Sequence, residues 1–370
     1  MAPCRDSRAG RGGPRRRREA RGRRARPRGR AVARLPARAR PARLLPPRRA
    51  EGDRRSPPPC ASVRTNRAFA LRRIVWQVRR STPRIARPLS RVLPSFEPPK
   101  SPILVLGCPR SGTSILYEAL VRSPELRSVQ SEGHILWDEF HHPRDRGWDS
   151  DALDAGDVGE REREYVYCAV RLFVRRARFL DKTPESCLRV RYLDTLFPDA
   201  TFVFLRRSAA PTVSSLVEAW KARPRFVKYR LPETLNGLGP LSGNQWSFAL
   251  VPRWRELRDA SLEEVCARQY VACNEAVLDG RTEIDDARWI DLRYEDLVRN
   301  PVEELRTLHA RLGLELVPAA ARYAAGLAGN VSRTALSAPR AGKWREQNAE
   351  AIGRILPLVA DTERRLGYSA

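Results

Sequence analysis

Residues 102–121 read PILVLGCPRSGTSILYEALV, and this stretch decides the fold class. Ile103 to Leu106 form an uninterrupted apolar run, which is typical of a strand buried on both faces of a parallel sheet. Gly107 ends the run, and the apolar residues after Ser114 recur at helical spacing. A strand, a short turn and a helix N-terminus aim backbone N–H groups and the helix dipole at one point, so the segment predicts an anion-binding loop.

The spacing of this loop is close to the Walker A pattern G-x-x-x-x-G-K-[ST], with Gly107, Gly112 and Ser114 in matching positions. Thr113 stands where that pattern has its lysine, and the positive charge lies inside the loop at Arg110. Nucleotide-hydrolysing enzymes use the lysine on the β- and γ-phosphates, so its replacement counts against a kinase or NTPase. A strand-to-helix turn without a ligand is the alternative.

A second strand with a basic end follows later in the chain. Residues 201–205, TFVFL, are followed by two arginines and then by a helical pattern. An arginine at a strand end, with a serine two turns into the next helix, can hold a phosphate through a guanidinium and a hydroxyl. Two registers keep this spacing: Arg206 with Ser214, and Arg207 with Ser215. A solvent-exposed arginine pair is the alternative interpretation.

The two segments resemble the cofactor sites of sulfotransferases that use 3′-phosphoadenosine 5′-phosphosulfate (PAPS). The family's P-[KR]-S-G-T-[ST] loop is matched at every position by Pro109, Arg110, Ser111, Gly112, Thr113 and Ser114. The resemblance implies that this loop binds the 5′-phosphosulfate, and that Arg207 and Ser215 bind the 3′-phosphate. We prefer this register because the family's strand commonly has one residue between its last leucine and the arginine. Ile115 departs from the family, since cytosolic members carry there a tryptophan that stacks on adenine.

The same resemblance suggests the catalytic residues. Lys182, within FLDKTPES (179–186), is similar to the family lysine that interacts with the leaving phosphosulfate. Cytosolic members carry a histidine base two residues later, where this chain has Pro184. Heparan-type and bacterial relatives use a glutamate after the first helix, which corresponds to Glu132, and a carboxylate in such a cleft can act as a general base. His134, expected on the same face of a strand, is the competing candidate.

Two C-terminal segments carry weaker similarities. The text RYEDL resembles a family element whose tyrosine approaches the adenine, which would make Tyr294 a cofactor contact; a buried structural tyrosine is the alternative. SAPRAGKWREQ (337–347) loosely resembles a segment that closes on the 3′-phosphate, and it predicts Lys343 in a loop. Residues 150–178 and 216–280 predict amphipathic helices and long loops, where we expect an acceptor pocket.

Charge divides the chain into two parts. Residues 1–100 hold 31 Lys and Arg against 5 Asp and Glu, whereas residues 101–370 hold 39 against 38. The text of 1–62 is built mainly from Arg, Ala, Pro and Gly and buries little apolar surface, so we expect 1–100 to be a disordered tail before a sulfotransferase domain. A short amphipathic helix is predicted within it at 67–80. A nucleic-acid or anionic-lipid tail, an organelle transit segment and an overextended gene start compete as explanations.

Seven scattered cysteines without a C-x-x-C pair favour a reducing compartment over a disulfide framework or a zinc site. His141 and His142 lack further ligands at metal spacing, so a surface or acceptor-site role is expected for them. No apolar run approaches the roughly 20 residues that span a bilayer, and we expect a cytoplasmic protein.

The sequence therefore predicts a P-loop-NTPase-like parallel sheet flanked by helices. The resemblance implies sulfuryl transfer from PAPS to a hydroxyl of a carbohydrate, lipid or small-molecule acceptor, with no metal required. A P-loop nucleotide kinase or NTPase is one alternative. The other is a non-enzymatic, basic-tailed nucleic-acid-binding protein, and we expect a nucleic-acid partner only through the basic tail.

Overall fold

The computed structural model describes residues 86, 88, 90, 96–129, 132–327, 329, 332, 334–337, 340 and 342–368. The predicted tail at 1–62 and the amphipathic helix at 67–80 lie outside the described residues, and the proposed boundary at residue 100 stays a prediction.

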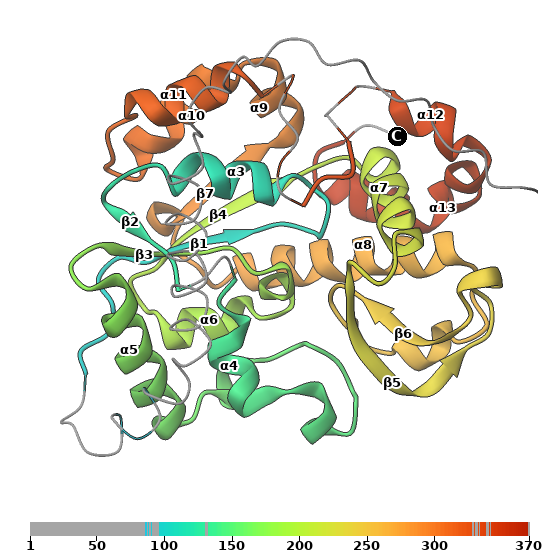
Figure 1. Ribbon diagram of the computed structural model, residues 1–370, viewed down its shortest axis with the longest axis horizontal. Helices are drawn as coiled ribbons and strands as arrows, with labels where there is room; N and C mark the ends of the chain where they lie inside the picture. The colour runs from blue at the N-terminus through green and yellow to red at the C-terminus, as the bar shows by residue number, and fades with distance from the viewer. Residues whose placement is uncertain are drawn as a thin grey trace, which may run out of the picture. The chain divides into compact units, whose positions relative to one another are not determined.

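A five-stranded parallel sheet lies at the centre of the fold, in the order β2-β3-β1-β4-β7 (Figure 1). Its strands are β1 (Ile103–Leu106), β2 (Leu126–Arg127), β3 (Arg178–Asp181), β4 (Thr201–Arg206) and β7 (Trp289–Arg293). The apolar runs predicted as buried strands are confirmed, because every residue of β1 is buried and β4 is buried between its two ends. β1 pairs with both β3 and β4, so the loop that follows it opens at the middle of the sheet's carboxyl edge.

Helices cover both faces of the sheet, as predicted (Figure 1). One face carries α3 (Thr113–Leu120), α9 (Tyr294–Arg299), α10 (Pro301–Arg311) and α11 (Pro318–Ala325). The other carries α5 (Glu160–Val174), α6 (Val190–Leu196), α8 (Leu262–Arg281) and the short 3₁₀ helix η3 (Pro184–Leu188). The remaining α-helices are α4 (His134–His141), α7 (Ala209–Lys221), α12 (Lys343–Gln347) and α13 (Ala349–Arg365).

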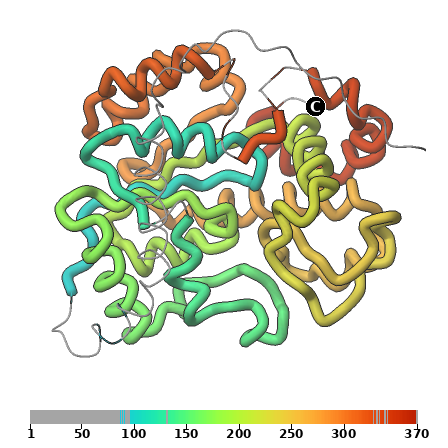
Figure 2. Tube along the Cα trace, viewed as in Figure 1, coloured from blue at the N-terminus to red at the C-terminus, as the bar shows by residue number. Residues whose placement is uncertain are grey.

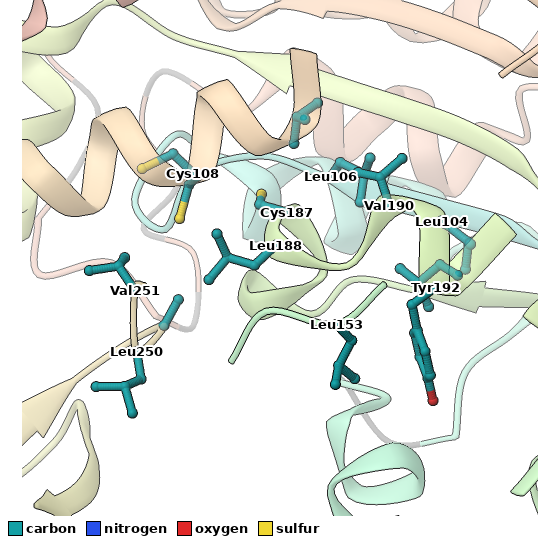
Figure 3. Close-up of a cluster of buried hydrophobic side chains, with 14 of the residues drawn as sticks. Leu104, Leu106, Cys108, Leu153, Cys187, Leu188, Val190, Tyr192, Leu250 and Val251 are labelled. Atoms are coloured by element: carbon teal, nitrogen blue, oxygen red, sulfur yellow. The ribbon is translucent and has the colours of Figure 1, made fainter. Parts of the chain in front are cut away.

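The alternation of β1 side chains creates two cores. Ile103 and Val105 pack into the cluster beneath α3, whereas Leu104 and Leu106 pack into the larger cluster on the opposite face. Figure 3 shows part of the larger cluster, in which Cys108, after β1, lies near Cys187 of η3. Close packing of Cys108 in this cluster holds the backbone at the start of the 107–114 loop.

An antiparallel hairpin stands apart from the central sheet. It consists of β5 (Val227–Leu235) and β6 (Gly243–Ser247), and Figure 2 shows it in yellow beside α8. The prediction of helices and long loops throughout 216–280 is therefore wrong for these residues, although α8 confirms a helix in the same range. The signal was present, because Val227, Tyr229 and Leu231 alternate with Lys228 and Arg230, which is the period of a strand.

Cys108, Cys168, Cys187, Cys266 and Cys273 are all buried free thiols. Within the described ranges, no helix combines the length and the apolar character needed to cross a membrane.

Candidate functional site

The 107–114 loop wraps from β1 into α3 with a conformation that requires glycine. Gly112 has φ of 108°, which side chains with a Cβ rarely adopt, and a Cβ there would lie 2.4 Å from the ring of Tyr294. The backbone N–H of Ser111 donates to the carbonyl of Cys108 at 2.9 Å, which closes the turn. The buried hydroxyl of Ser111 has no hydrogen-bond partner among the described residues.

Arg110 connects the loop to two other parts of the chain. Its Nε donates to Ser215 Oγ at 3.2 Å, and its Nη1 donates to the carbonyl of Thr334 at 2.8 Å. Burial, together with the nearby charges of Arg207 and Arg225, lowers the pKa of Arg110 to about 10. The guanidinium still carries its charge at neutral pH, but a site that repels this charge favours an anion beside it.

The structure separates the two adjacent arginines at the end of β4. Arg206 turns away from the loop and donates to the carbonyl of Leu366. Arg207 turns toward the loop, where its Nη1 donates to the carbonyl of Arg110 at 3.1 Å and its guanidinium lies 4.1 Å from the centre of the Tyr294 ring. Arg207 Nε is buried without a hydrogen-bond partner among the described residues.

The geometry therefore brings Arg207, not Arg206, to the loop. The position of the two serines does not separate the two registers in the same way, because both Ser214 and Ser215 line the same cavity. Ser214 accepts a hydrogen bond from Asn348 at 2.9 Å, whereas Ser215 accepts one from Arg110.

A first cavity opens over the loop, and we call it the loop cavity. Most of the predicted cofactor residues line it together: Arg110, Gly112, Thr113, Ser114, Arg207, Ser215, Tyr294 and Lys343. Pro109 instead lines the neighbouring cavity, and the buried Ser111 lines neither. Lys343 begins α12, so its prediction in a loop is wrong; it follows Gly342, whose φ of 69° starts the helix abruptly.

A second cavity, which we call the side cavity, adjoins the first. Arg110, Thr113, Ser114 and Thr334 line both cavities. The other walls of the side cavity come from Glu132, His134, Lys182, η3 and the start of the β5–β6 hairpin. Sequence analysis predicts an acceptor pocket at 150–178 and 216–280. Residues 225–228 and Phe248 line this cavity, whereas none of its lining residues comes from 150–178.

The predicted catalytic residues meet at the side cavity. Lys182 follows β3, is only 4% exposed, and donates from Nζ to Glu132 Oε1 at 2.7 Å. His134 Nδ1 lies 3.6 Å from Glu132 Oε2. The expectation that His134 lies on a strand is wrong, because it is the first residue of α4 and its position next to Glu132 comes from the turn at Gly133.

A buried clamp that sequence reasoning missed holds this turn. The backbone N–H of Gly133 donates to Asp181 Oδ1 at 2.6 Å and to Thr183 Oγ1 at 2.7 Å. Thr183 Oγ1 in turn donates to Asp181 Oδ1 at 3.0 Å. The two residues flank Lys182, so a single stretch of chain positions both members of the Lys182–Glu132 pair. The D-K-T-P text was the available signal, although only its lysine suggested a role.

His141 and His142, which are adjacent in the sequence, line neither cavity. His141 Nε2 lies 2.8 Å from Glu162 Oε2, and His142 packs edge-on against Trp148 and Tyr229. The described part of the chain contains no cluster of three or more Cys, His, Asp or Glu arranged to hold a metal ion.

Comparison with known proteins identifies one family. The family model described as "Sulfotransferase family" matches residues 102–239 and 241–318, which is more than half of the chain. The chain is also 24% identical over 268 residues to the omega-hydroxy-beta-dihydromenaquinone-9 sulfotransferase Stf3 of Mycobacterium bovis. The match covers 58% of this chain and 63% of that protein, so the chain spans less than two thirds of the relative's length.

Solved structures with a similar arrangement include sulfotransferase STF9 from Mycobacterium avium, with 14% identity, a TM-score of 0.46 and coverage of 76% of this chain and 80% of that one. The sulfotransferase domain from the curacin biosynthetic pathway has 16% identity and a TM-score of 0.43, with coverage of 74% of this chain and 99% of that one.

Proposed function

Because the chain belongs to the sulfotransferase family, we propose that it transfers the sulfuryl group of PAPS to a hydroxyl of a small-molecule or lipid acceptor. The observation that carries this proposal is the junction of the two cavities. The anion-binding loop forms a wall of both, and the Lys182–Glu132 pair lies on the side-cavity wall next to that loop. A group donor and a group acceptor can therefore meet beside an acid–base pair.

The loop cavity has the donors that a bisphosphate requires. Arg110 and the backbone N–H groups of 111–114 would hold the 5′-phosphosulfate at the start of α3. Arg207 and Ser215 would hold the 3′-phosphate, for which the unpartnered Arg207 Nε is suited. Tyr294 and Lys343 complete the lining.

Transfer forms a bond between the sulfur of PAPS and the acceptor oxygen, and it breaks the bond from that sulfur to the bridging oxygen. Glu132 takes the proton of the acceptor hydroxyl, because its carboxylate reaches the side cavity and its side chain is 30% exposed. Lys182 offsets the negative charge that develops on the departing oxygen. His134 lies next to Glu132 and is the second candidate for the base.

The acceptor class follows from the walls of the side cavity. Phe226 and Phe248 stack with ring centres 5.4 Å apart and present an aromatic surface. This surface suits the carbon skeleton of an aromatic or prenylated alcohol. The Mycobacterium bovis relative, whose name gives an omega-hydroxylated dihydromenaquinone as its substrate, points in the same direction.

Isothermal titration of the full chain with adenosine 3′,5′-bisphosphate (PAP), 5′-AMP and ATP tests the proposal. We expect PAP to bind at least tenfold more tightly than 5′-AMP, because only PAP carries a 3′-phosphate for Arg207. Equal or tighter binding of ATP would contradict the 3′-phosphate site and favour a nucleotide kinase.

A further inference from the structure

Glu185 is a buried carboxylate on the wall of the side cavity that the proposed transfer does not use. It lies in η3, three residues after Lys182, and its side chain is 4% exposed. Oε1 forms an ion pair with Lys228 Nζ at 2.8 Å. Oε2 is buried and has no hydrogen-bond partner in the part of the chain that the structure describes.

The surroundings keep this carboxylate ionised. Burial on its own would raise the pKa of Glu185, but the positive charge of Lys228 and the nearby His134 outweigh burial and lower the pKa to about 2. An ionised oxygen without a hydrogen-bond donor is costly inside a protein. A ligand that supplies a donor at Oε2 removes that cost, and this makes the carboxylate a recognition group.

The charges around Glu185 decide what kind of donor fits. Lys228 Nζ also lies 3.8 Å from both Asp138 Oδ2 and Asp151 Oδ1, and Arg189 contacts the same two aspartates. Glu185 therefore already has a cation on Oε1, and Lys228 lines the same cavity. Because Lys228 already supplies the positive charge at Oε1, Oε2 needs only a hydrogen-bond donor, and a neutral hydroxyl supplies one.

We propose that Glu185 recognises a second hydroxyl on the acceptor, so that the preferred substrates are alcohols with a further hydroxyl near the one that is sulfated. This inference rests on the proposed function, because it treats the side cavity as the acceptor site. Glu132, Lys182, Glu185 and the stacked Phe226 and Phe248 all line this one cavity. A diol on an aryl or prenyl skeleton has one hydroxyl for the Lys182–Glu132 pair, a second hydroxyl for Glu185, and a carbon skeleton for the two phenylalanine rings.

Four alcohols test this assignment, by ligand-observed NMR titration of the full chain with and without PAP. They are 2-phenylethanol, 1-phenyl-1,2-ethanediol, 2-methoxy-2-phenylethanol and 2-amino-2-phenylethanol. The methoxy compound has the second oxygen without its proton, and the amino compound has a cation in that place. We expect the diol to bind at least tenfold more tightly than the methoxy compound. Equal affinities for the diol and the methoxy compound, or no binding of either, would overturn the proposal. Tighter binding of the amino compound than of the diol would contradict the assignment of a neutral donor at Oε2.

Variants distinguish recognition of the hydroxyl by Glu185 from the structural role of its ion pair with Lys228. Glu185→Met combined with Lys228→Met replaces the buried ion pair with apolar side chains of similar length, a change that proteins often tolerate. In this double variant and in Glu185→Gln we expect the tenfold preference to fall to about threefold or less, with unchanged PAP affinity as the sign of an intact fold. The matched control is Glu233→Gln, the same exchange at a carboxylate of the β5–β6 hairpin that pairs with Arg255 and Arg258 and does not line the side cavity.

A preference that persists in the double variant would show that Glu185 does not recognise the donor. Different measurements contradict the two proposals. If PAP binds no more tightly than 5′-AMP, the proposed cofactor site is contradicted, whatever the alcohols do. The alcohol titrations without PAP do not involve the cofactor, so the comparison of the diol with the methoxy compound bears on the side cavity and Glu185 and not on the 3′-phosphate site.

Discussion

Lys182 Nζ and Glu132 Oε1 are 2.7 Å apart at the side-cavity wall, and only the lysine is fully buried. An ammonium bound to the carboxylate lowers the cost of burying each charge. It also means that each group has the other as its partner until substrates enter.

Replacing either member of this pair should stop transfer without preventing cofactor binding. We expect Lys182→Met and Glu132→Gln each to lower kcat by 10²-fold or more, because one removes the charge near the leaving oxygen and the other the base. The affinity for PAP, measured by titration, should change by less than tenfold. Lys100→Met, at an exposed lysine, is the control. Full activity in Lys182→Met would refute its role.

The neighbouring arginines at the end of β4 provide a matched pair. Arg207→Ala should weaken PAP binding by about 10- to 100-fold, the range expected for hydrogen bonds to a charged group, and leave 5′-AMP binding nearly unchanged. Arg206→Ala should lower the melting temperature, since Arg206 holds the carbonyl of Leu366, but it should not change the preference for PAP over 5′-AMP. If Arg206→Ala removed the preference for PAP over 5′-AMP and Arg207→Ala kept it, the 3′-phosphate would be assigned to Arg206.

Gly112→Ala tests the close approach of Tyr294 to the loop. The added Cβ would lie 2.4 Å from the tyrosine ring, at a backbone φ of 108°. We expect PAP affinity to fall more than tenfold, because the loop must move. Gly147→Ala is the control, since Gly147 also has a positive φ, 66°, but no atom within 4 Å of the added Cβ. It should cost only about 1–2 kcal/mol of strain and leave PAP binding intact.

The clamp at Asp181 should make stability depend on pH. Burial raises the pKa of Asp181 to about 7, against the opposing effect of hydrogen bonds from Thr183 and Gly133. The pKa in the unfolded chain is about 4, so between pH 4 and 7 the folded protein binds the extra proton and its stability decreases as the pH rises. Asp181→Asn keeps the acceptor oxygen and removes this decrease.

Thermal melts at pH 5 and pH 8 measure this effect. The melting temperature of Asp181→Asn relative to the parent should be higher at pH 8 than at pH 5. Asp361→Asn, at a carboxylate that is 85% exposed, should show no such change. A parallel shift of both proteins with pH would contradict the raised pKa.

Local patterns in the sequence predicted the central elements well. The apolar runs of β1 and β4 and the glycine-containing loop are contiguous, so their structure follows from neighbouring residues. The preference for Arg207 over Arg206 came from the family resemblance and not from a local pattern, and the structure turns Arg207 toward the loop and Arg206 toward Leu366.

Contacts between distant segments were less predictable. Thr334 lies 224 residues from Arg110 in the chain and still accepts its hydrogen bond, and no pattern near either residue indicates the contact. The Asp181–Gly133 bond joins residues 48 apart. This bond holds the turn before α4, and the residues around His134 carry no local signal for it, so the sequence predicts a strand there.

Arg110 belongs to the walls of both cavities, and the ring of Phe226 lies 5.3 Å from its guanidinium. At Arg110, no more than one side chain therefore separates the two cavities. A single inhibitor that links an adenosine bisphosphate to an aryl diol by a short tether could occupy both at once. Such a bisubstrate compound would gain the effective concentration of an intramolecular second contact, which neither half has alone.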